Sequence, residues 1–178
     1  MGYTGGSSSD PTYHRLGDHT ESFQIDYDPT RLSYETLLGD FWKDADPTER
    51  PYKRQYMCAV FYADETQKRL ALETAKQAME GRSGPMLLPL LALATFYRAE
   101  DYHQKYYLRR YTDLMREFSA YSEREFADST VAMWLNACVG GQLKREGLEA
   151  ELERLDLPEA DRQQLLRLAL AALAHRRR

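Results

Sequence analysis

The hydrophobic positions of the chain recur at two periods, one typical of strands and one typical of helices. Residues 22–27 alternate between polar and apolar side chains, which predicts a strand with one buried face. Residues 55–62 are almost continuously apolar and predict a central strand, and the apolar run 86–96 predicts another. Residues 2–20 are rich in glycine, serine and proline and predict a loop. The buried side of the first strand would hold Phe23, Ile25 and Tyr27.

Helical spacing of apolar residues predicts a helix that follows Ser33 as N-cap and ends before the Asp-Pro pair at 46–47. A second helix would begin after Asp64, with Gln67 at the capping-box position, and run to about Met79. The buried stripe of the first helix would be Tyr34, Leu37, Leu38, Phe41 and Trp42.

The last part of the chain is patterned as helix almost throughout. Residues 101–115 predict a tyrosine-rich helix, and helical spacing continues from Glu123 onward, with Pro158 opening the last helix. The order of elements, βαβα(β)α followed by helices, predicts an α+β fold. We expect a two-layer domain with a C-terminal helical extension.

Composition and charge narrow the possible functions. The 178 residues are 43% hydrophobic and suit one domain with an extension. A net charge of −4 argues against nucleic acid as a partner. The run 86–96 is too short to cross a membrane, and no secretory signal is visible, so we expect a cytoplasmic protein with no membrane span. Cys58 and Cys138 then predict free thiols or a redox pair.

Three polar side chains are candidates for chemistry. Glu21 precedes the predicted strand on its apolar side, where lost solvation would raise the carboxyl pKa and let the group donate a proton. Tyr13 and Tyr56 are phenols that donate hydrogen bonds without carrying charge. Together they would suit a polar oxygen on an uncharged substrate. The alternatives are a solvated strand-edge carboxylate and two packed tyrosines among 13. The four histidines show no zinc-binding spacing.

Several short motifs follow one another in a recognisable order. The chain resembles the A-class peptide-methionine (S)-S-oxide reductases over residues 2–135. We therefore predict a reductase-like domain of residues 1–135, followed by a helical extension of residues 136–178. The motifs are GYTGG (2–6), DPTY (10–13), GDHTE (17–21), YDPTRLSYETLLGDFW (27–42), DPT (46–48), RQYMCAVFY (54–62), AEDYHQKYY (99–107) and FADST (126–130).

The resemblance implies a thiol-dependent repair enzyme that reduces methionine S-sulfoxide, free or in proteins. A cysteine thiolate attacks the sulfoxide sulfur in that family, and a Glu and two Tyr hold and protonate its oxygen. The positions that match the motifs are Glu21, Tyr13 and Tyr56. The resemblance further implies thioredoxin or another thiol reductant as partner, with no metal or organic cofactor.

The chain departs from the family at its beginning. Relatives carry a strand and a helix before GYTGG, with the nucleophile in Gly-Cys-Phe-Trp, and this sequence has no such segment. The resemblance therefore implies a ferredoxin-like, split βαβ domain that lacks its first strand and helix. We expect a fragment whose natural form carries about 40–50 more residues, one strand–helix–strand unit.

Three functions remain open at this point. Cys58 is two residues from Tyr56 on the predicted strand and could substitute as nucleophile, with Cys138 as resolving cysteine. The chain could instead bind methionine sulfoxide without turnover. It could also be an interaction module that docks a partner through its last helix, although packing of that helix within the chain is favoured.

Overall fold

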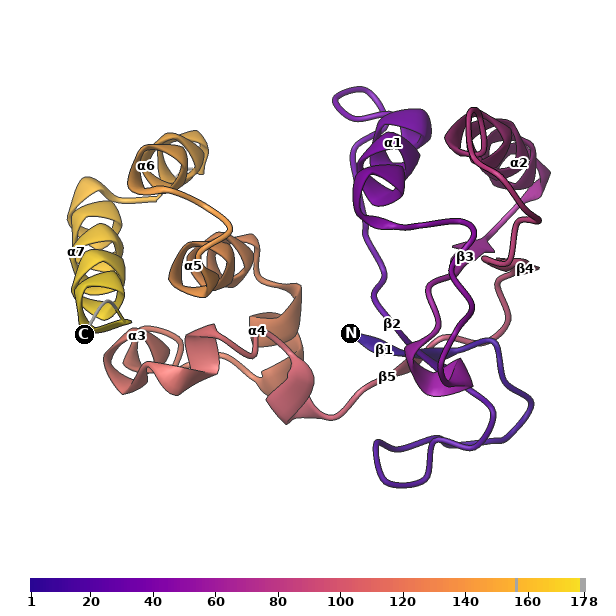
Figure 1. The fold of residues 1–178 in the computed structure, drawn as a ribbon. Helices are drawn as coiled ribbons and strands as arrows, with labels where there is room; N and C mark the ends of the chain where they lie inside the picture. Colours follow the sequence, from indigo (N-terminus) through magenta and orange to yellow (C-terminus); the bar gives the residue numbers. More distant parts are fainter. Residues whose placement is uncertain (156, 177–178) are drawn as a thin grey trace. The chain divides into compact units, whose positions relative to one another are not determined.

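The computed structural model describes residues 1–155 and 157–176 (Figure 1). The chain separates into two compact units, Met1–Glu100 and Asp101–Arg178. In the described residues all strands lie in the first unit, and the second unit is helical. The mixture of helices and sheet confirms the α+β class. The predicted division at residue 135 concerns the extent of a family domain and stays a prediction.

A three-stranded antiparallel sheet holds the N-terminal part of the first unit. Its order is β2-β1-β5, with Tyr3 opposite Glu21 on one side and opposite Tyr97 on the other. The prediction of a loop over residues 2–20 was therefore wrong at its start, where Tyr3 is the one large apolar residue. The strands are β1 (Gly2–Thr4), β2 (Thr20–Ser22) and β5 (Tyr97–Arg98).

The strand predicted over residues 22–27 does not form. Phe23 and Ile25 are 67% and 48% exposed, and β2 ends at Ser22. The physical reason is the length of the neighbouring strand, because β1 begins at Gly2, which pairs with Ser22. The described residues give the segment after Ser22 no strand partner, and alternation alone does not make a strand without one.

The second sheet of the first unit is a two-stranded parallel sheet of β3 (Val60–Tyr62) and β4 (Leu90–Ala92). The central strand predicted over residues 55–62 is thus wrong for its first half, and Arg54–Tyr56 forms the 3-10 turn η1 instead. Val60 N–H donates to the carbonyl of Pro89. Proline has no backbone N–H that could continue the ladder toward the chain before Val60, so the ladder ends there.

Helices α1 (Tyr34–Asp44) and α2 (Glu65–Ala78) lie side by side and cover the parallel strands (Figure 1). Both predicted N-caps are confirmed: Ser33 accepts from Thr36 N–H at 3.1 Å, and Asp64 accepts from Gln67 N–H at 2.8 Å. The core between these elements contains Leu38, Ala45, Val60, Ala71 and Leu88.

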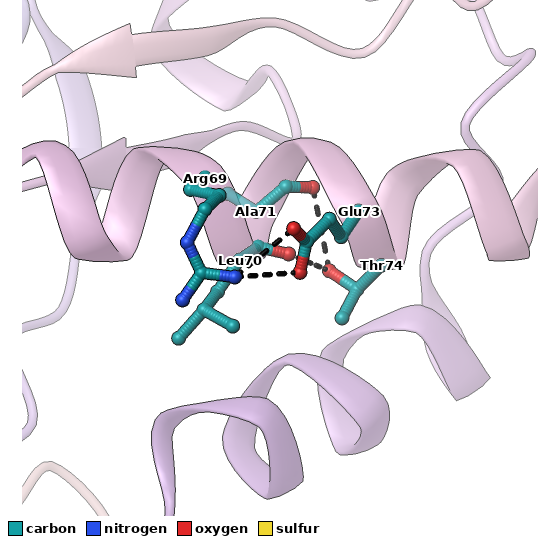
Figure 2. Close-up of polar contacts among 5 residues, drawn as sticks. All are labelled: Arg69, Leu70, Ala71, Glu73 and Thr74. Atoms are coloured by element: carbon teal, nitrogen blue, oxygen red, sulfur yellow. Dashed lines mark hydrogen bonds and ion pairs between the residues drawn. The ribbon is translucent and has the colours of Figure 1, made fainter.

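The middle of α2 carries polar contacts along two of its faces (Figure 2). Arg69 forms an ion pair with Glu73 on the exposed face, and the Thr74 hydroxyl donates to the Leu70 carbonyl at 2.9 Å. Trp42 of α1 donates its indole N–H to the same Thr74 hydroxyl at 3.0 Å. This bond joins the two helices and satisfies a partly buried indole donor.

The second unit is built around α5 (Thr130–Gly140), whose Ala132, Leu135 and Cys138 are fully buried. The single helix predicted over residues 101–115 is broken, because Lys105 has φ of 52°, which no right-handed helix contains. The remaining elements are η2 (Asp101–His103), η3 (Leu108–Arg110), α3 (Thr112–Arg116), α4 (Glu123–Asp128), α6 (Arg145–Arg154) and α7 (Glu159–Arg176).

The last helix packs within its own unit, as favoured from the sequence. Leu165, Ala169 and Ala172 of α7 belong to the buried core around α5. The partly buried Leu166, Leu168 and Leu173 pack against the same core. Across the described residues, no helix combines the length and apolarity needed to cross a membrane.

The core of the second unit yields a stability prediction. Leu135→Ala removes a fully buried side chain and is expected to lower the free energy of unfolding by about 2–5 kcal/mol, through lost burial and a cavity. Met133→Ala, on the same helix with 40% exposure, is the matched control and should cost much less. Urea unfolding followed by circular dichroism measures both. Equal losses would contradict the packing of α5.

Candidate functional site

Tyr13, Glu21 and Tyr56 come together from three separate segments of the first unit. A hydrogen bond joins the Tyr13 and Tyr56 side chains, and the Glu21 carboxylate acts electrostatically on Tyr56. The Glu21 carboxylate accepts from the Gln55 side-chain amide at 2.7 Å. Tyr13 and Tyr56 are 38% and 57% exposed and Glu21 is half-buried, so the cluster opens to solvent. The predicted trio therefore shares one place in the structure.

The surroundings of Tyr56 favour the protonated phenol. Desolvation around the hydroxyl raises the pKa of Tyr56, and the neighbouring Tyr13 and the Glu21 carboxylate raise it further. A phenol that keeps its proton remains a hydrogen-bond donor at neutral pH. The site therefore offers uncharged donors beside a carboxyl group. That arrangement suits a substrate with a polar, uncharged oxygen.

Arg54 fastens the turn that carries Tyr56 to two neighbouring loops. Its guanidinium donates to the Asp18 carbonyl at 2.5 Å and to the Gly5 carbonyl at 2.6 Å. Its own carbonyl accepts from the Thr20 hydroxyl at 3.0 Å. These bonds connect η1 to the ends of β1 and β2, and they place Tyr56 next to Glu21.

Asp18 holds the loop after β1 in a closed shape. Its carboxylate accepts from the backbone N–H and the hydroxyl of Ser7, and from the backbone N–H of Ser8. These donors hold the pKa of Asp18 far below its ordinary value of 3.8. The loop lacks a strand partner here, and the carboxylate satisfies its backbone donors instead.

His19 is a structural residue rather than a ligand. It is 1% exposed, and its Nδ1 accepts from Gly6 N–H at 3.2 Å while its Nε2 lies 2.7 Å from the Ser8 carbonyl. This pairing assigns the proton to Nε2. A Cβ on Gly6 would lie within 2.7 Å of the imidazole, so the close approach requires glycine.

The two cysteines occupy different environments. Cys58 is exposed and lies between η1 and β3, so the prediction that it shares a strand with Tyr56 is wrong. Although the residue is exposed, partial desolvation of its thiol and the nearby Glu49 carboxylate raise the pKa of Cys58. Cys138 is buried in α5, which raises its thiol pKa too. Raised pKa values lower the thiolate fraction of both residues.

The sequence reasoning missed Glu100, which follows β5. Its carboxylate accepts from Tyr13 N–H at 2.9 Å and from the Tyr3 hydroxyl at 2.7 Å. Glu100 lies within the motif AEDYHQKYY, but a separation of 87 residues from Tyr13 hides the contact from any local pattern.

Two cavities are lined by residues of the second unit, whereas the cluster belongs to the first. One of about 510 Å³ is lined by α4 and its flanks, and one of about 210 Å³ lies between α6 and α7. Neither lining contains a candidate residue. The chemistry points to the loop cluster of the first unit, because that cluster gathers the perturbed phenol and the carboxyl group. The described residues contain no group of three or more His, Cys, Asp or Glu that could hold a metal ion.

Known proteins match most of the chain. The family model for peptide methionine sulfoxide reductase matches residues 1–133. A peptide methionine sulfoxide reductase of Drosophila melanogaster is 39% identical over 165 residues, which cover 92% of this chain and 67% of that protein. Peptide methionine sulfoxide reductase A5 of Oryza sativa is 35% identical over 143 residues, 77% of this chain and 56% of that protein. The chain thus spans about half to two thirds of these relatives.

The contacts of Asp18 predict a pH-dependent stability. Asp18→Asn should lower the melting temperature at neutral pH, because the loop loses its charged acceptor. Folding lowers the pKa of Asp18, so its contribution is complete above 3.8 and is lost as pH falls toward the folded pKa. The difference in melting temperature between the unaltered chain and Asp18→Asn should therefore become smaller in acid. Asp10→Asn, in the same loop region, is the control. A gap that persists unchanged in acid would contradict the assignment.

The coupled phenols predict a measurable titration. Tyr13→Phe should lower the pKa of Tyr56 toward 10.0, because it removes both the hydrogen bond and the charge interaction with Tyr13. Carbon NMR of labelled tyrosines across alkaline pH measures the change. Tyr52→Phe, at a position that is 89% exposed, is the control and should leave Tyr56 unaltered. An unchanged Tyr56 in Tyr13→Phe would show that the phenols are not coupled.

Proposed function

Because this chain belongs to the peptide methionine sulfoxide reductase family, we propose that it acts in the thiol-dependent reduction of methionine S-sulfoxide, free or in proteins. The observation that carries the proposal is the meeting of Tyr13, Glu21 and Tyr56 in one solvent-facing cluster. The family match supports the reaction, and the cluster supports where in the chain it takes place. The enzyme class would be an oxidoreductase that acts on sulfur.

The cluster suits the oxygen of a sulfoxide. That oxygen is a strong acceptor without a formal net charge on the molecule, and the two phenols are neutral donors that face one place. Glu21, held by Gln55, supplies a carboxyl group that can pass a proton to the oxygen as the S–O bond breaks. In this proposal Tyr13 and Tyr56 bind the oxygen, and Glu21 is the proton donor.

The overall reaction sets what else is needed. One sulfoxide and two thiols give one thioether, one disulfide and one water. The sulfur of methionine gains two electrons from the thiols, and the two thiol protons leave with the oxygen as water. A thiolate must therefore reach the sulfoxide sulfur while the oxygen is protonated. We propose thioredoxin or another dithiol as the final reductant, and this partner, like the cytoplasmic location, stays a prediction.

Cys58 is the candidate nucleophile within these residues, and Cys138 the candidate resolving thiol. Cys58 supports the proposal by being exposed in the same unit as the cluster. Its raised pKa works against it, because less thiolate is present at neutral pH. The Gly-Cys-Phe-Trp motif of the family is not among the 178 residues.

The proposal extends to the architecture of the first unit. β3, α2 and β4 form a parallel strand–helix–strand crossover, and β1 pairs antiparallel with both of its neighbours. We propose that these two sheets are parts of the ferredoxin-like, split βαβ arrangement that the resemblance implies. The crossover is the feature that supports it.

A second function is favoured by the thiol chemistry. If no thiolate forms at Cys58, the cluster would bind methionine sulfoxide without turnover. The same three side chains would then serve recognition alone. Binding and turnover separate the two functions.

The test measures dithiothreitol-dependent reduction of methionine S-sulfoxide by the full chain, with the R-sulfoxide as substrate control. Glu21→Gln is expected to lower kcat/KM by about 10²-fold, because it removes the proton donor. Tyr52→Phe serves as the matched control, since Tyr52 is 89% exposed. Full activity in Glu21→Gln would contradict the assigned role.

The same assay tests whether Cys58 is the nucleophile. Cys58→Ser should abolish turnover while sulfoxide binding, measured by calorimetry, persists. Full dithiothreitol-dependent activity in Cys58→Ser would rule out Cys58 as nucleophile. Binding without turnover in the unaltered chain would support the second function. Neither binding nor turnover would contradict both.

A further inference from the structure

We propose that Glu100 is a positioning residue that holds Tyr13 in the place required by the sulfoxide-binding cluster. The inference rests on the proposed function and deepens it by adding a residue that does not touch the substrate. Glu100 acts through the backbone of Tyr13 rather than through its phenol.

The turn around Tyr13 is tight, and its own backbone bonds do not use the Tyr13 N–H. Thr12 and Arg15 exchange backbone hydrogen bonds of 3.3 and 3.0 Å, so Tyr13 and His14 form the tip. The Tyr13 N–H takes no part in this exchange and donates to Glu100 Oε1 at 2.9 Å. A bond at this point fixes the peptide from which the Tyr13 side chain departs.

The other oxygen of Glu100 is tied to the central strand of the sheet. Oε2 accepts from the Tyr3 hydroxyl at 2.7 Å, and Tyr3 is 2% exposed in β1. The backbone before Glu100 is fixed as well, because Ala99 is 4% exposed and its N–H donates to the Met1 carbonyl at 3.1 Å. The carboxylate thus transmits the position of a buried strand to an exposed turn.

The position of the turn matters because Tyr56 is held by a different set of bonds. Tyr56 lies two residues after Arg54, and the Arg54 guanidinium donates hydrogen bonds to the Asp18 and Gly5 carbonyls. The two phenols meet only if both supports keep their places. A displacement of about 1 Å in a binding group can cost about 10²-fold in rate. Glu100 is the support on the Tyr13 side.

The experiment compares the full chain with Glu100→Ala and Glu100→Gln. Glu100→Ala removes both acceptors. It should shift the pKa of Tyr56 in the same direction as Tyr13→Phe does and weaken the sulfoxide affinity about tenfold. Glu100→Gln keeps an oxygen for Tyr13 N–H and offers its amide to the Tyr3 hydroxyl, so it should restore both readouts to within about twofold. If Glu100→Ala does not fold, Glu100→Met takes its place.

Tyr3→Phe is the control for a purely structural role. It removes the hydroxyl bonded to Oε2 but keeps the acceptor of Tyr13 N–H and the backbone bond of Ala99, so it should lower the melting temperature and shift the Tyr56 titration less than Glu100→Ala does. Equal titration changes in Tyr3→Phe and Glu100→Ala would overturn the proposal. So would a Tyr56 titration unaltered by removing the carboxylate.

The two readouts separate this inference from the proposed function. The Tyr56 titration needs no substrate, so it tests the link from Glu100 to Tyr13 even if the chain does not reduce sulfoxide. An unaltered chain that neither binds nor reduces sulfoxide overturns the proposed function, and the Tyr56 titration in Glu100→Ala then still decides whether Glu100 positions Tyr13. An active chain whose sulfoxide affinity is unchanged in Glu100→Ala overturns the positioning role alone.

Discussion

The arrangement of the first unit depends on the pairing of β1 with a strand on each side. Tyr3, at its centre, faces Glu21 across one pair and Tyr97 across the other. These pairs bring together backbone segments that are about 20 and 95 residues apart in the chain. Three residues of strand thereby fix the start of the segment that carries Glu21 and the end of the segment that carries Glu100. Loss of this pairing would release the segment that carries Glu21 from the segment that carries Glu100.

Beyond the ends of the strands, side chains form the hydrogen bonds that hold the backbone of the loops. The loops around the cluster have few backbone partners, and a buried or half-buried donor without a partner is costly. Asp18, His19 and Arg54 each bond to backbone groups of a neighbouring loop. Their charges and ring nitrogens are used for shape rather than for substrate. This explains why polar residues are dense around the cluster of Tyr13, Glu21 and Tyr56.

The sequence predicted what depends on neighbours within a few residues. Both helix caps, at Ser33 and Asp64, were found because a cap and its acceptor lie three residues apart. The strand over residues 22–27 was wrong because its alternation said nothing about a missing partner. The break at Lys105 depends on a positive backbone φ angle, which a lysine does not predict.

The candidate trio shows the same division. The local reason for choosing Glu21, an apolar strand face shared with Phe23, does not hold, since Phe23 is 67% exposed. The order of motifs selected the residues, and tertiary contacts bring them together. Glu100 could not be found in this way, because nothing in its surroundings along the chain indicates a bond to Tyr13.

The electrostatics of the cluster act in opposite ways on its two kinds of chemistry. Desolvation and nearby negative charge raise the pKa of Tyr56 and so preserve a neutral donor. The same two causes raise the pKa of Cys58 and so withhold the thiolate. A reactive thiolate needs a cation or a helix N-terminus beside it. Cys58 follows the short turn η1 instead and lies near the Glu49 carboxylate. The surroundings of these side chains therefore favour holding an oxygen over attacking a sulfur, because Cys58 lacks the features that would activate its thiol.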